Sequence, residues 1–576
     1  MKKLLLTTFF VVTFFTFSAV SASAGVVNNM IKVGLSYADT ARFSANLENK
    51  VGLGYDFGYY DEGRAFHSVG RTGEKAISMT AAGDIYMSTN GTYSAQPDTG
   101  ANLHMGVWHA QTDPVSSYEE AVLLAEELDG YPAWINFEYV VRIGSFASPE
   151  EAMARIAMIG SGQVVQSSPT GVVVTITKTP EVIFEFDCGG ALDLGVLPDG
   201  QGADALTWFN GYQYPGGFEY PRMTPGGNLH VYNVVDLEDY VKGVIPFEMN
   251  RSWPLAALEA QAICARTFAC GRTRHYNAYG FDVCSEVDCQ VYYGFSGGSN
   301  GPNERTNAAV DNTAGMMLYF NGELVKSAVY HASNGGATEN VENVWTSQLG
   351  YLRGKEDPYE TQTNLPSSYR SWSVTYTADE LEQILTLKGY GIGTVRDVYI
   401  SAYTDVGNVR QVTIVGSKGT VTFSGENART IFYSSAMGKS VRSMRFTISG
   451  GSNPTATQKP NTTTGNAVYV NDSQTKLDQL SGVAVLSGSG TKSTLNGTSF
   501  TVLTSSGLTT VKSGNNDNPT VVTPPAASSG GGVYTITGSG SGHNLGLSQY
   551  GAKAMAELGY TFDEILHFYY TGITIE

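Results

Sequence analysis

Charge is scarce in this sequence, and basic residues are the scarcer kind. Charged residues make up 15% of the 576 residues, and 35 Lys and Arg stand against 53 Asp and Glu, so the formal net charge is −18. Proteins that bind DNA or RNA through the phosphate backbone draw their affinity from Lys and Arg. The composition therefore argues against a nucleic-acid partner, and it is compatible with a neutral polymer such as a glycan.

Long apolar runs are also missing, except at the N-terminus. Two lysines precede an apolar run from Leu4 to about Val20, and an Ala-Ser-Ala motif follows, ending at Ala24. This pattern is typical of a signal peptide, here cleaved after Ala24, and an uncleaved anchor is the alternative. No later stretch reaches the roughly 18 apolar residues of a membrane span. We therefore expect an exported protein, in the cell wall or at the outer face of the membrane.

Cysteine is rare and odd in number. The five cysteines are Cys188, Cys264, Cys270, Cys284 and Cys289. Because an odd number in an exported chain leaves at least one thiol unpaired, the sequence does not describe a small disulfide scaffold. The 67 glycines and 34 tyrosines indicate instead turn-rich β structure with aromatic surfaces for stacking.

The length allows about three or four domains, and shifts in the hydrophobic pattern suggest where they lie. We predict an α+β fold class, in which β-rich segments flank a pair of helices. The expected order is a β-rich module over 25–105, a small α+β module over 106–180, a larger domain over 181–449, a Ser/Thr/Gly-rich insertion or linker over 450–532, and a return to that domain over 533–576.

Two capped helical patterns over residues 236–272 are the best-specified part of the sequence. Asp236 is a good N-cap residue, and apolar residues follow it at helical spacing. We expect Pro246 to end this helix and a second helix to begin after Ser252. Glu248 lies in the short break between them. A carboxylate there is either a catalytic group or a cap of the following helix.

Four stretches, in this order, resemble the stage II sporulation protein D (SpoIID) and LytB amidase-enhancer family. They are DLEDYVKGVIPFEMNRSWPLAALEAQAICARTFA, FDVCSEVDCQVYYG, YHASNGGATENVENVW and GSGHNLGLSQYGAKAMAELGYTFDEILHFYYTG. The resemblance covers roughly 181–449 and 533–576, and it implies a SpoIID-like catalytic domain whose helical pair carries the active-site turn. It also implies a peptidoglycan lytic transglycosylase with Glu248, in the Pro-Phe-Glu-Met turn, as its single general acid.

This resemblance leaves different functions open. One is an exported enzyme that cleaves the bond between N-acetylmuramic acid (MurNAc) and N-acetylglucosamine (GlcNAc), leaving 1,6-anhydro-MurNAc ends, in sporulation or septal wall remodelling. Such an enzyme requires no cofactor. The alternative is a non-catalytic, LytB-like wall binder that enhances a separate amidase, and a third is a purely structural wall protein. The expected partners are peptidoglycan glycan strands and a cell-wall amidase or endopeptidase.

The resemblance also implies substrate-binding residues around the catalytic turn. They are Gln261, Arg266, Tyr330, His331, Ser333, His543, Gln549 and Tyr550. From the residues alone, Arg266 can instead pair with Glu259 on the helix surface, and Ser548 can serve as an N-cap of the last long helix. The family usually has Gly-Val where this sequence has Asn544-Leu545, and this departure puts the shape of the terminal motif in doubt.

A metal site is a further expectation. Some family members bind zinc through a Cys-x-x-x-His-Cys cluster with a histidine upstream, and the matching residues here are Cys284, Cys289 and His275. Asp288 stands where the family pattern has a histidine. Structural zinc sites favour Cys and His, so a structural zinc competes with two free thiols or a disulfide.

The segment over 106–180 has a resemblance of its own. Val-Arg-Ile-Gly-Ser-Phe-Ala-Ser, followed by a helical pattern containing Ala152, resembles the SPOR domain, a module that binds septal peptidoglycan. Its two β-α-β halves predict a small sandwich with one exposed sheet face. An unrelated ferredoxin-like spacer fits the same pattern.

Overall fold

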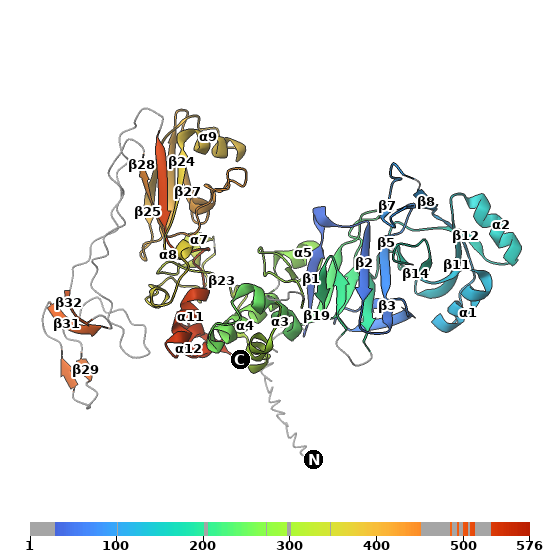
Figure 1. Ribbon diagram of the computed structural model, residues 1–576, viewed down its shortest axis with the longest axis horizontal. Helices are drawn as coiled ribbons and strands as arrows, with labels where there is room; N and C mark the ends of the chain where they lie inside the picture. The colour runs from blue at the N-terminus through green and yellow to red at the C-terminus, as the bar shows by residue number, and fades with distance from the viewer. Residues whose placement is uncertain are drawn as a thin grey trace, which may run out of the picture.

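The chain folds around two separate hydrophobic cores. The structure is a computed structural model that describes residues 29–100, 102–200, 205–271, 273–295, 301–345, 347–450 and 532–576, and four short strands between 484 and 512. The predicted signal peptide lies outside these residues. Within them, every helix is too short or too polar to cross a membrane. In Figure 1 the N-terminal sheets, blue to green, lie on one side of the central helices, and an orange lobe lies on the other.

The N-terminal half forms two large sheets that share the main core. The seven-stranded sheet has the order β20 (Val283–Cys284), β1 (Met30–Ser36), β19 (Val231–Asp236), β18 (Gly217–Tyr220), β15 (Leu194–Asp199), β3 (Gly54–Tyr60), β4 (Phe66–Thr72). The ten-stranded sheet has the order β12 (Gln163–Gln166), β9 (Trp108–Gln111), β11 (Glu138–Phe146), β10 (Tyr131–Ile135), β14 (Val182–Asp187), β13 (Val172–Ile176), β5 (Ala76–Ala81), β2 (Ser44–Asn49), β16 (Thr207–Phe209), β17 (Tyr212–Tyr214). A small sheet of β7 (Tyr93–Ser94), β6 (Ile85–Ser88) and β8 (Asn102–Met105) packs beside the ten-stranded one. The 3-10 helix η1 (Ala38–Thr40) follows β1.

The ten-stranded sheet crosses the module boundaries that the sequence suggested near residues 105 and 180. It combines β2 and β5 from before the first boundary, β9 to β13 from between the two, and β14, β16 and β17 from after the second. Residues 25–105 and 106–180 therefore do not form separate sheets. Strand β1 also pairs with β19, with Met30 opposite Asp236, so the N-terminal half is joined directly to the helical part.

Helices α1 (Tyr118–Leu128) and α2 (Pro149–Ile159) cover one face of this sheet, as the sequence pattern predicts. The predicted exposure of the opposite face is wrong. Arg142 on β11 is 3% exposed and forms an ion pair with Glu185 on β14, which is fully buried. A charge withdrawn from water requires a partner, and Tyr131 donates a further hydrogen bond of 3.2 Å to Glu185. The centre of that face is therefore a closed polar cluster rather than an open platform.

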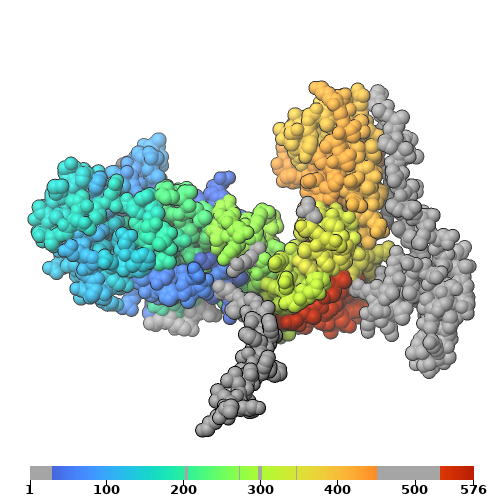
Figure 2. Space-filling model, turned by 180° about the vertical axis from the view of Figure 1, so that it is seen from behind, coloured from blue at the N-terminus to red at the C-terminus, as the bar shows by residue number. Residues whose placement is uncertain are grey.

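Helix α4 (Leu255–Cys270) lies at the centre of the helical part. Its neighbours are α3 (Leu237–Glu248), α6 (Glu304–Asn312), α11 (Gln549–Glu557) and α12 (Phe562–Tyr569), and α5 (Arg274–Tyr279) follows it in the chain. The alanines on its faces are buried and allow this close packing. Two small sheets complete the part, one of β22 (Glu323–Leu324), β21 (Leu318–Phe320) and β35 (Ile573–Ile575), the other of β23 (Tyr330–His331) and β34 (Leu547–Ser548). Helices α11 and α12, which follow His543, pack back onto α4 across the inserted segment, as the family resemblance implied, and Figure 2 shows this end of the chain in red.

The second core belongs to a separate lobe, which the sequence pattern had placed within the single domain predicted over 181–449. Its elements are β24 (Trp372–Thr377), α9 (Ala378–Leu387), β25 (Val395–Tyr403), β26 (Val409–Gly416), β27 (Thr420–Ser424), α10 (Asn427–Thr430), β28 (Phe446–Gly450) and β33 (Val533–Gly538). Short helices α7 (Val341–Val344), η3 (Glu360–Gln362) and α8 (Ser367–Arg370) precede it. Strand β33 lies between β24 and β28, with Gly450 opposite Tyr534. The segment over 450–532 is thus inserted between two adjacent strands of one sheet.

The inserted segment contains two hairpins within its described strands. They are β29 (Ala484–Leu486) with β30 (Lys492–Thr494), and β31 (Ser499–Thr504) with β32 (Gly507–Lys512). Small or polar residues largely alternate with larger apolar ones at 482–486 and 499–503, a pattern typical of β structure, and strands β29 and β31 lie at these places.

Candidate active site

Glu248 is the last residue of α3, so this helix extends past Pro246, where the sequence predicted its end. Asp236 caps the start of this helix, as predicted, by accepting hydrogen bonds from the backbone N–H groups of Glu238 and Asp239. The prediction that Pro246 ends the helix is wrong. Proline lacks an N–H and crowds the preceding turn, but the helix continues for two residues beyond it, and the N–H of Met249 bonds to the carbonyl of Ile245 and closes the last turn. The carboxylate is therefore fixed on a helix end.

Three donors converge on the carboxyl group of Glu248. The backbone N–H of Val291 donates to Oε1 at 3.2 Å, Nε2 of Gln549 donates to Oε2 at 3.4 Å, and the Tyr330 hydroxyl also donates to the carboxylate. Burial raises the pKa of Glu248 above that of a free glutamate, while the three donors oppose the rise because they stabilise the charged form. Among the described residues, no second carboxylate contributes to this shift.

The donors are held in turn by a second set of polar groups. Gln549 donates at 3.4 Å to Gln261 on α4, and Gln290 donates at 3.0 Å to the hydroxyl of Tyr330. Tyr240 on α3 donates at 2.8 Å to Gln290. Nε2 of Gln261 is buried without a hydrogen-bond partner among the described residues. Three residues that the family resemblance implied, Tyr330, Gln261 and Gln549, thus lie together with the predicted acid.

Half-exposed aromatic rings belong to residues next in the chain to Glu248 and next to its donor Gln549. Trp253 meets Tyr550 at 4.7 Å between ring centroids, and Tyr550 meets Tyr369 at 5.5 Å. Next to Glu248 in the chain, Phe247 meets Tyr293 edge-on at 5.3 Å. Such rings present apolar faces to the flat C–H faces of sugars. The surroundings of Glu248 therefore combine a shielded acid with surfaces suited to a carbohydrate.

Arg266 lies away from this group, so the prediction that it lines the substrate site is not supported by its position. Its guanidinium is fully buried and grips Glu238 with two hydrogen bonds of 2.8 and 2.6 Å. Glu238 is in the first turn of α3, about 15 Å along the helix axis from Glu248 at 1.5 Å per residue. The alternative pairing with Glu259 is also wrong, because Glu259 accepts instead from Asn312 at 2.9 Å.

Ser333 does not face the acid either, because its hydroxyl donates to the buried carboxylate of Glu360. The backbone N–H groups of Asn334 and Gly335 donate to the same carboxylate at 2.8 and 3.0 Å, and Ser548 donates at 2.7 Å. Burial raises the pKa of Glu360, and the neighbouring Asp357 raises it further. Sequence reasoning missed this carboxylate, because nothing in its immediate sequence marks it. Ser548 also caps α11 through the N–H of Gly551, as the alternative reading expected.

His331, which is buried, and His543, which is half-buried, form a separate pair. Their rings lie 5.3 Å apart, and His543 lies 5.3 Å from Trp345. Burial is the main cause that lowers the pKa of His331 to about 3 and of His543 to about 4, so both are neutral at pH 7. Nδ1 of His331 bonds to the carbonyl of Leu545 at 3.0 Å. The structure therefore gives these two histidines a packing environment rather than contact with Glu248.

The departure of the terminal motif from the family pattern has a structural explanation. Asn544 adopts a left-handed backbone with φ of +65°, a conformation that asparagine tolerates better than most residues with a side chain. Its amide nitrogen donates to the carbonyls of Asn334 and Ala337 at 2.7 and 3.1 Å. Asparagine thus reproduces the backbone turn that a glycine allows and adds two hydrogen bonds to the segment 333–337.

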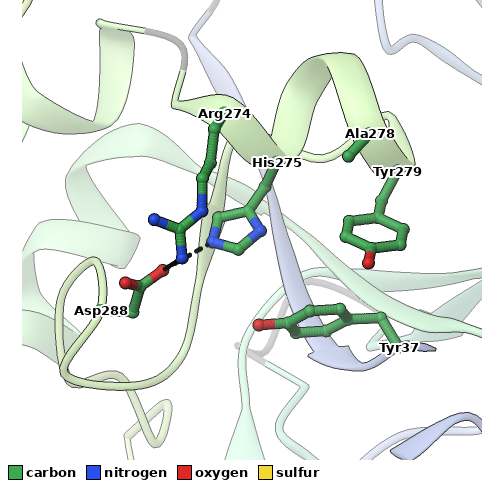
Figure 3. A pocket seen from close by; sticks show the side chains of 6 residues that line it. All are labelled: Tyr37, Arg274, His275, Ala278, Tyr279 and Asp288. Carbon is green, nitrogen blue, oxygen red and sulfur yellow. Dashed lines mark hydrogen bonds and ion pairs between the residues drawn. The ribbon is translucent and has the colours of Figure 1, made fainter. Parts of the chain in front are cut away.

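The predicted metal ligands come together. One ligand atom from each of His275, Cys284, Asp288 and Cys289 lies within 4.8 Å of the other three. Tetrahedral zinc with bonds of 2.0–2.3 Å needs neighbouring ligand atoms roughly 3.3–3.8 Å apart, so small side-chain shifts would suffice. Figure 3 shows Asp288 turned toward His275 and Arg274, at 3.0 and 2.6 Å. The residues present therefore fit a zinc ion, and the two cysteines are not joined as a disulfide here.

Comparisons with known proteins agree with the motifs. Residues 225–320 match the SpoIID family model, described as stage II sporulation protein. An amidase enhancer of Bacillus subtilis is 32% identical over 384 residues, which are 66% of this chain and 46% of the relative. Stage II sporulation protein D of the same organism is 31% identical over 179 residues, 29% of this chain and 50% of the relative. An uncharacterised protein of Brachyspira hyodysenteriae is 26% identical over 409 residues, 70% and 84% of the two chains. The chain spans about half the length of the two Bacillus relatives.

Proposed function

Because this chain belongs to the SpoIID/LytB family of cell-wall proteins, we propose that it is an exported lytic transglycosylase acting on peptidoglycan glycan. The observation that supports the proposal most directly is the setting of Glu248. Glu248 is a lone carboxyl group whose pKa is raised by burial, and such a group suits a general acid that starts protonated. Aromatic rings lie next in the chain to Glu248 and to its donor Gln549.

The reaction needs one carboxyl group. Glu248 gives its proton to the glycosidic oxygen between MurNAc and GlcNAc, and the bond from that oxygen to the anomeric carbon breaks. The C6 hydroxyl of the same MurNAc unit attacks the anomeric carbon, and its proton passes to the Glu248 carboxylate. The product end is a 1,6-anhydro ring, and the acid is restored. Hydrolytic glycosidases need a second carboxylate to activate water or to act as nucleophile, whereas here the substrate supplies the nucleophile.

Glu248→Gln tests this reaction. Glutamine keeps the size and the hydrogen-bond acceptor but cannot transfer the proton, so we expect anhydro-MurNAc release from purified glycan strands to fall by about 10²–10⁴-fold. Glu259→Gln, a matched change on the outer side of α4, should leave the rate unchanged. Mass spectrometry of the released ends measures both. Equal product from wild type and Glu248→Gln would rule the mechanism out.

The amidase-enhancer relative favours a second candidate, a wall-binding protein that stimulates a separate amidase. The same variant separates the two candidates. If purified amidase is stimulated equally by wild type and by Glu248→Gln, and wild type forms no anhydro ends, the chain is an enhancer and not an enzyme.

For the four-residue cluster we propose a structural zinc held by His275, Cys284, Asp288 and Cys289. The ion would fasten the loop that follows α5, and it supplies no reacting group. Metal analysis of the purified protein should find about one zinc per chain, and a chelator should lower the melting temperature. Cys284→Ser should lose the zinc, and Cys270→Ser, which alters a thiol outside the cluster, should keep it. Zinc retained by Cys284→Ser would place the metal elsewhere.

A further inference from the structure

The edge of the ten-stranded N-terminal sheet reaches the neighbourhood of Glu248. Strand β17 ends the order of that sheet, and its Gln213 forms a parallel bridge with Gly294 of the chain segment after the metal cluster. The N–H of Phe295 donates to the carbonyl of Gln213 at 2.8 Å. Two backbone segments that are 81 residues apart in sequence, at Gln213 and Gly294, are therefore joined here by an isolated bridge.

This pairing sets two tyrosine rings face to face. Tyr212 of β17 and Tyr293 stack with centroids 4.6 Å apart and planes 13° from parallel. Both side chains are half-exposed. Tyr214 and Phe209, on the same face of the hairpin, are buried in the hydrophobic core. Tyr212 packs only partly against that core, and both rings of the stacked pair keep exposed surface.

The stacked pair connects to Glu248 in two ways. Tyr293 contacts Phe247, the residue before Glu248, at 5.3 Å between ring centroids. Tyr293 also follows Val291 by two residues, and the N–H of Val291 donates to the Glu248 carboxylate. The position of this pair relative to the acid is therefore fixed through both side chains and backbone.

We propose that Tyr212 and Tyr293 form a sugar-binding platform that holds the glycan strand on one side of Glu248, with Trp253 and Tyr550 on the other. The occupant is the glycan of the proposed function, on which this inference rests, and the new element is that the N-terminal sheet supplies part of the substrate site. A polymer held on both sides of the scissile bond keeps that bond aligned with the acid. The family match over 225–320 contains Tyr293 but not Tyr212.

Binding, rather than cleavage, tests the platform. In a Glu248→Gln background, purified full-length protein is titrated with peptidoglycan glycan strands, and the dissociation constant is measured. Tyr212→Ala and Tyr293→Ala should each weaken binding roughly tenfold, the factor that about 1.4 kcal/mol of lost aromatic contact gives. Tyr212→Phe should bind like the parent, because the ring face and not the hydroxyl makes the contact.

Tyr86→Ala is the matched control. Tyr86 stacks on His104 at 4.6 Å and 9° on the small sheet of β6 to β8, so its loss removes an equally stacked ring away from Glu248. The melting temperature of each variant checks folding. Unchanged binding in both alanine variants, or an equal loss in Tyr86→Ala, would overturn the platform. If the Glu248→Gln parent binds no glycan, the platform and the proposed function both fall. If the parent binds glycan but the wild-type protein forms no anhydro product, the platform stands and the proposed enzymatic activity falls.

Discussion

The buried ion pair between Arg266 and Glu238 allows a test of whether Arg266, which the family resemblance marks, stabilises the fold or binds substrate. Arg266 has a fully buried side chain, and Glu238 has a side chain that is 26% exposed. Besides its two bonds to Glu238, the guanidinium donates to the carbonyl of Met316 at 3.0 Å. Gly315 donates to the same carboxylate at 3.0 Å. The arginine therefore fastens α3 and the segment after α6 to α4, and we expect its loss to act on stability.

The magnitude follows from the contacts. Removing one partner of a buried ion pair costs about 3–5 kcal/mol, and because Glu238 keeps some access to water, Arg266→Met should cost about 3 kcal/mol. Arg266→Lys keeps the charge but loses the two-pronged geometry, so about 1.5–2 kcal/mol is expected. Arg71→Met, which breaks an exposed pair with Glu119, should cost less than 1 kcal/mol.

Urea unfolding of the three variants measures these costs, and glycan binding at a temperature where all remain folded measures the other role. We expect the free energy of unfolding to fall most in Arg266→Met and less in Arg266→Lys, relative to wild type. Glycan binding per folded molecule should be unchanged. A tenfold loss of binding in Arg266→Met without a loss of stability would refute the reasoning and restore the substrate role that the resemblance implied.

Two further predictions concern the acid and the insertion. In Tyr330→Phe the Glu248 carboxylate loses one donor to its charged form, so its pKa should rise further. Because the protonated acid is the active form, activity lost as pH increases should then be lost at a higher pH than in wild type, and a rate profile that shifts to lower pH would contradict the hydrogen bond. Since Gly450 lies opposite Tyr534, replacing residues 451–532 by Asn-Gly-Gly leaves a four-residue hairpin loop with Val533. Anhydro product and melting temperature should be retained, and loss of activity in a folded variant would show that the insertion shapes the site.

Local chemistry made much of the fold predictable. Asp236 caps α3 as expected, and Asn321-Gly322 turns between β21 and β22 with positive φ at both residues, a conformation that this dipeptide favours. These features depend on neighbours within a few residues, which a sequence displays directly. The inward return of the C-terminal segment is a long-range feature, and it could be predicted only because the family resemblance implied it.

Long-range pairing made the rest unpredictable. Glu360 is held by Ser333 and Ser548, which are 27 and 188 residues away, and no local pattern marks a carboxylate with such partners. Two acidic residues were candidates to pair with Arg266. Spacing along the chain favoured Glu259, which is on the same helix, but the packing of α3 against α4 places Glu238 beside the guanidinium instead. The closed face of the SPOR-like segment likewise depends on Glu185, which lies beyond the segment that carried the resemblance.

The setting of Glu248 is itself a long-range product. Of its three donors, Val291 lies within the matched residues 225–320, while Tyr330 and Gln549 lie outside them. Tyr330 and Gln549 are brought together by β23 and β34, a pairing of two residues each, which is too short to be stable alone. The buried Glu360 holds both strands, because it accepts from Ser333 after β23 and from Ser548 at the end of β34. Glu360, which the sequence did not mark, therefore positions the hydrogen-bond donors of Glu248, which the sequence did mark. The protonation of Glu248 thus depends on the docked C-terminal segment as much as on its own helix.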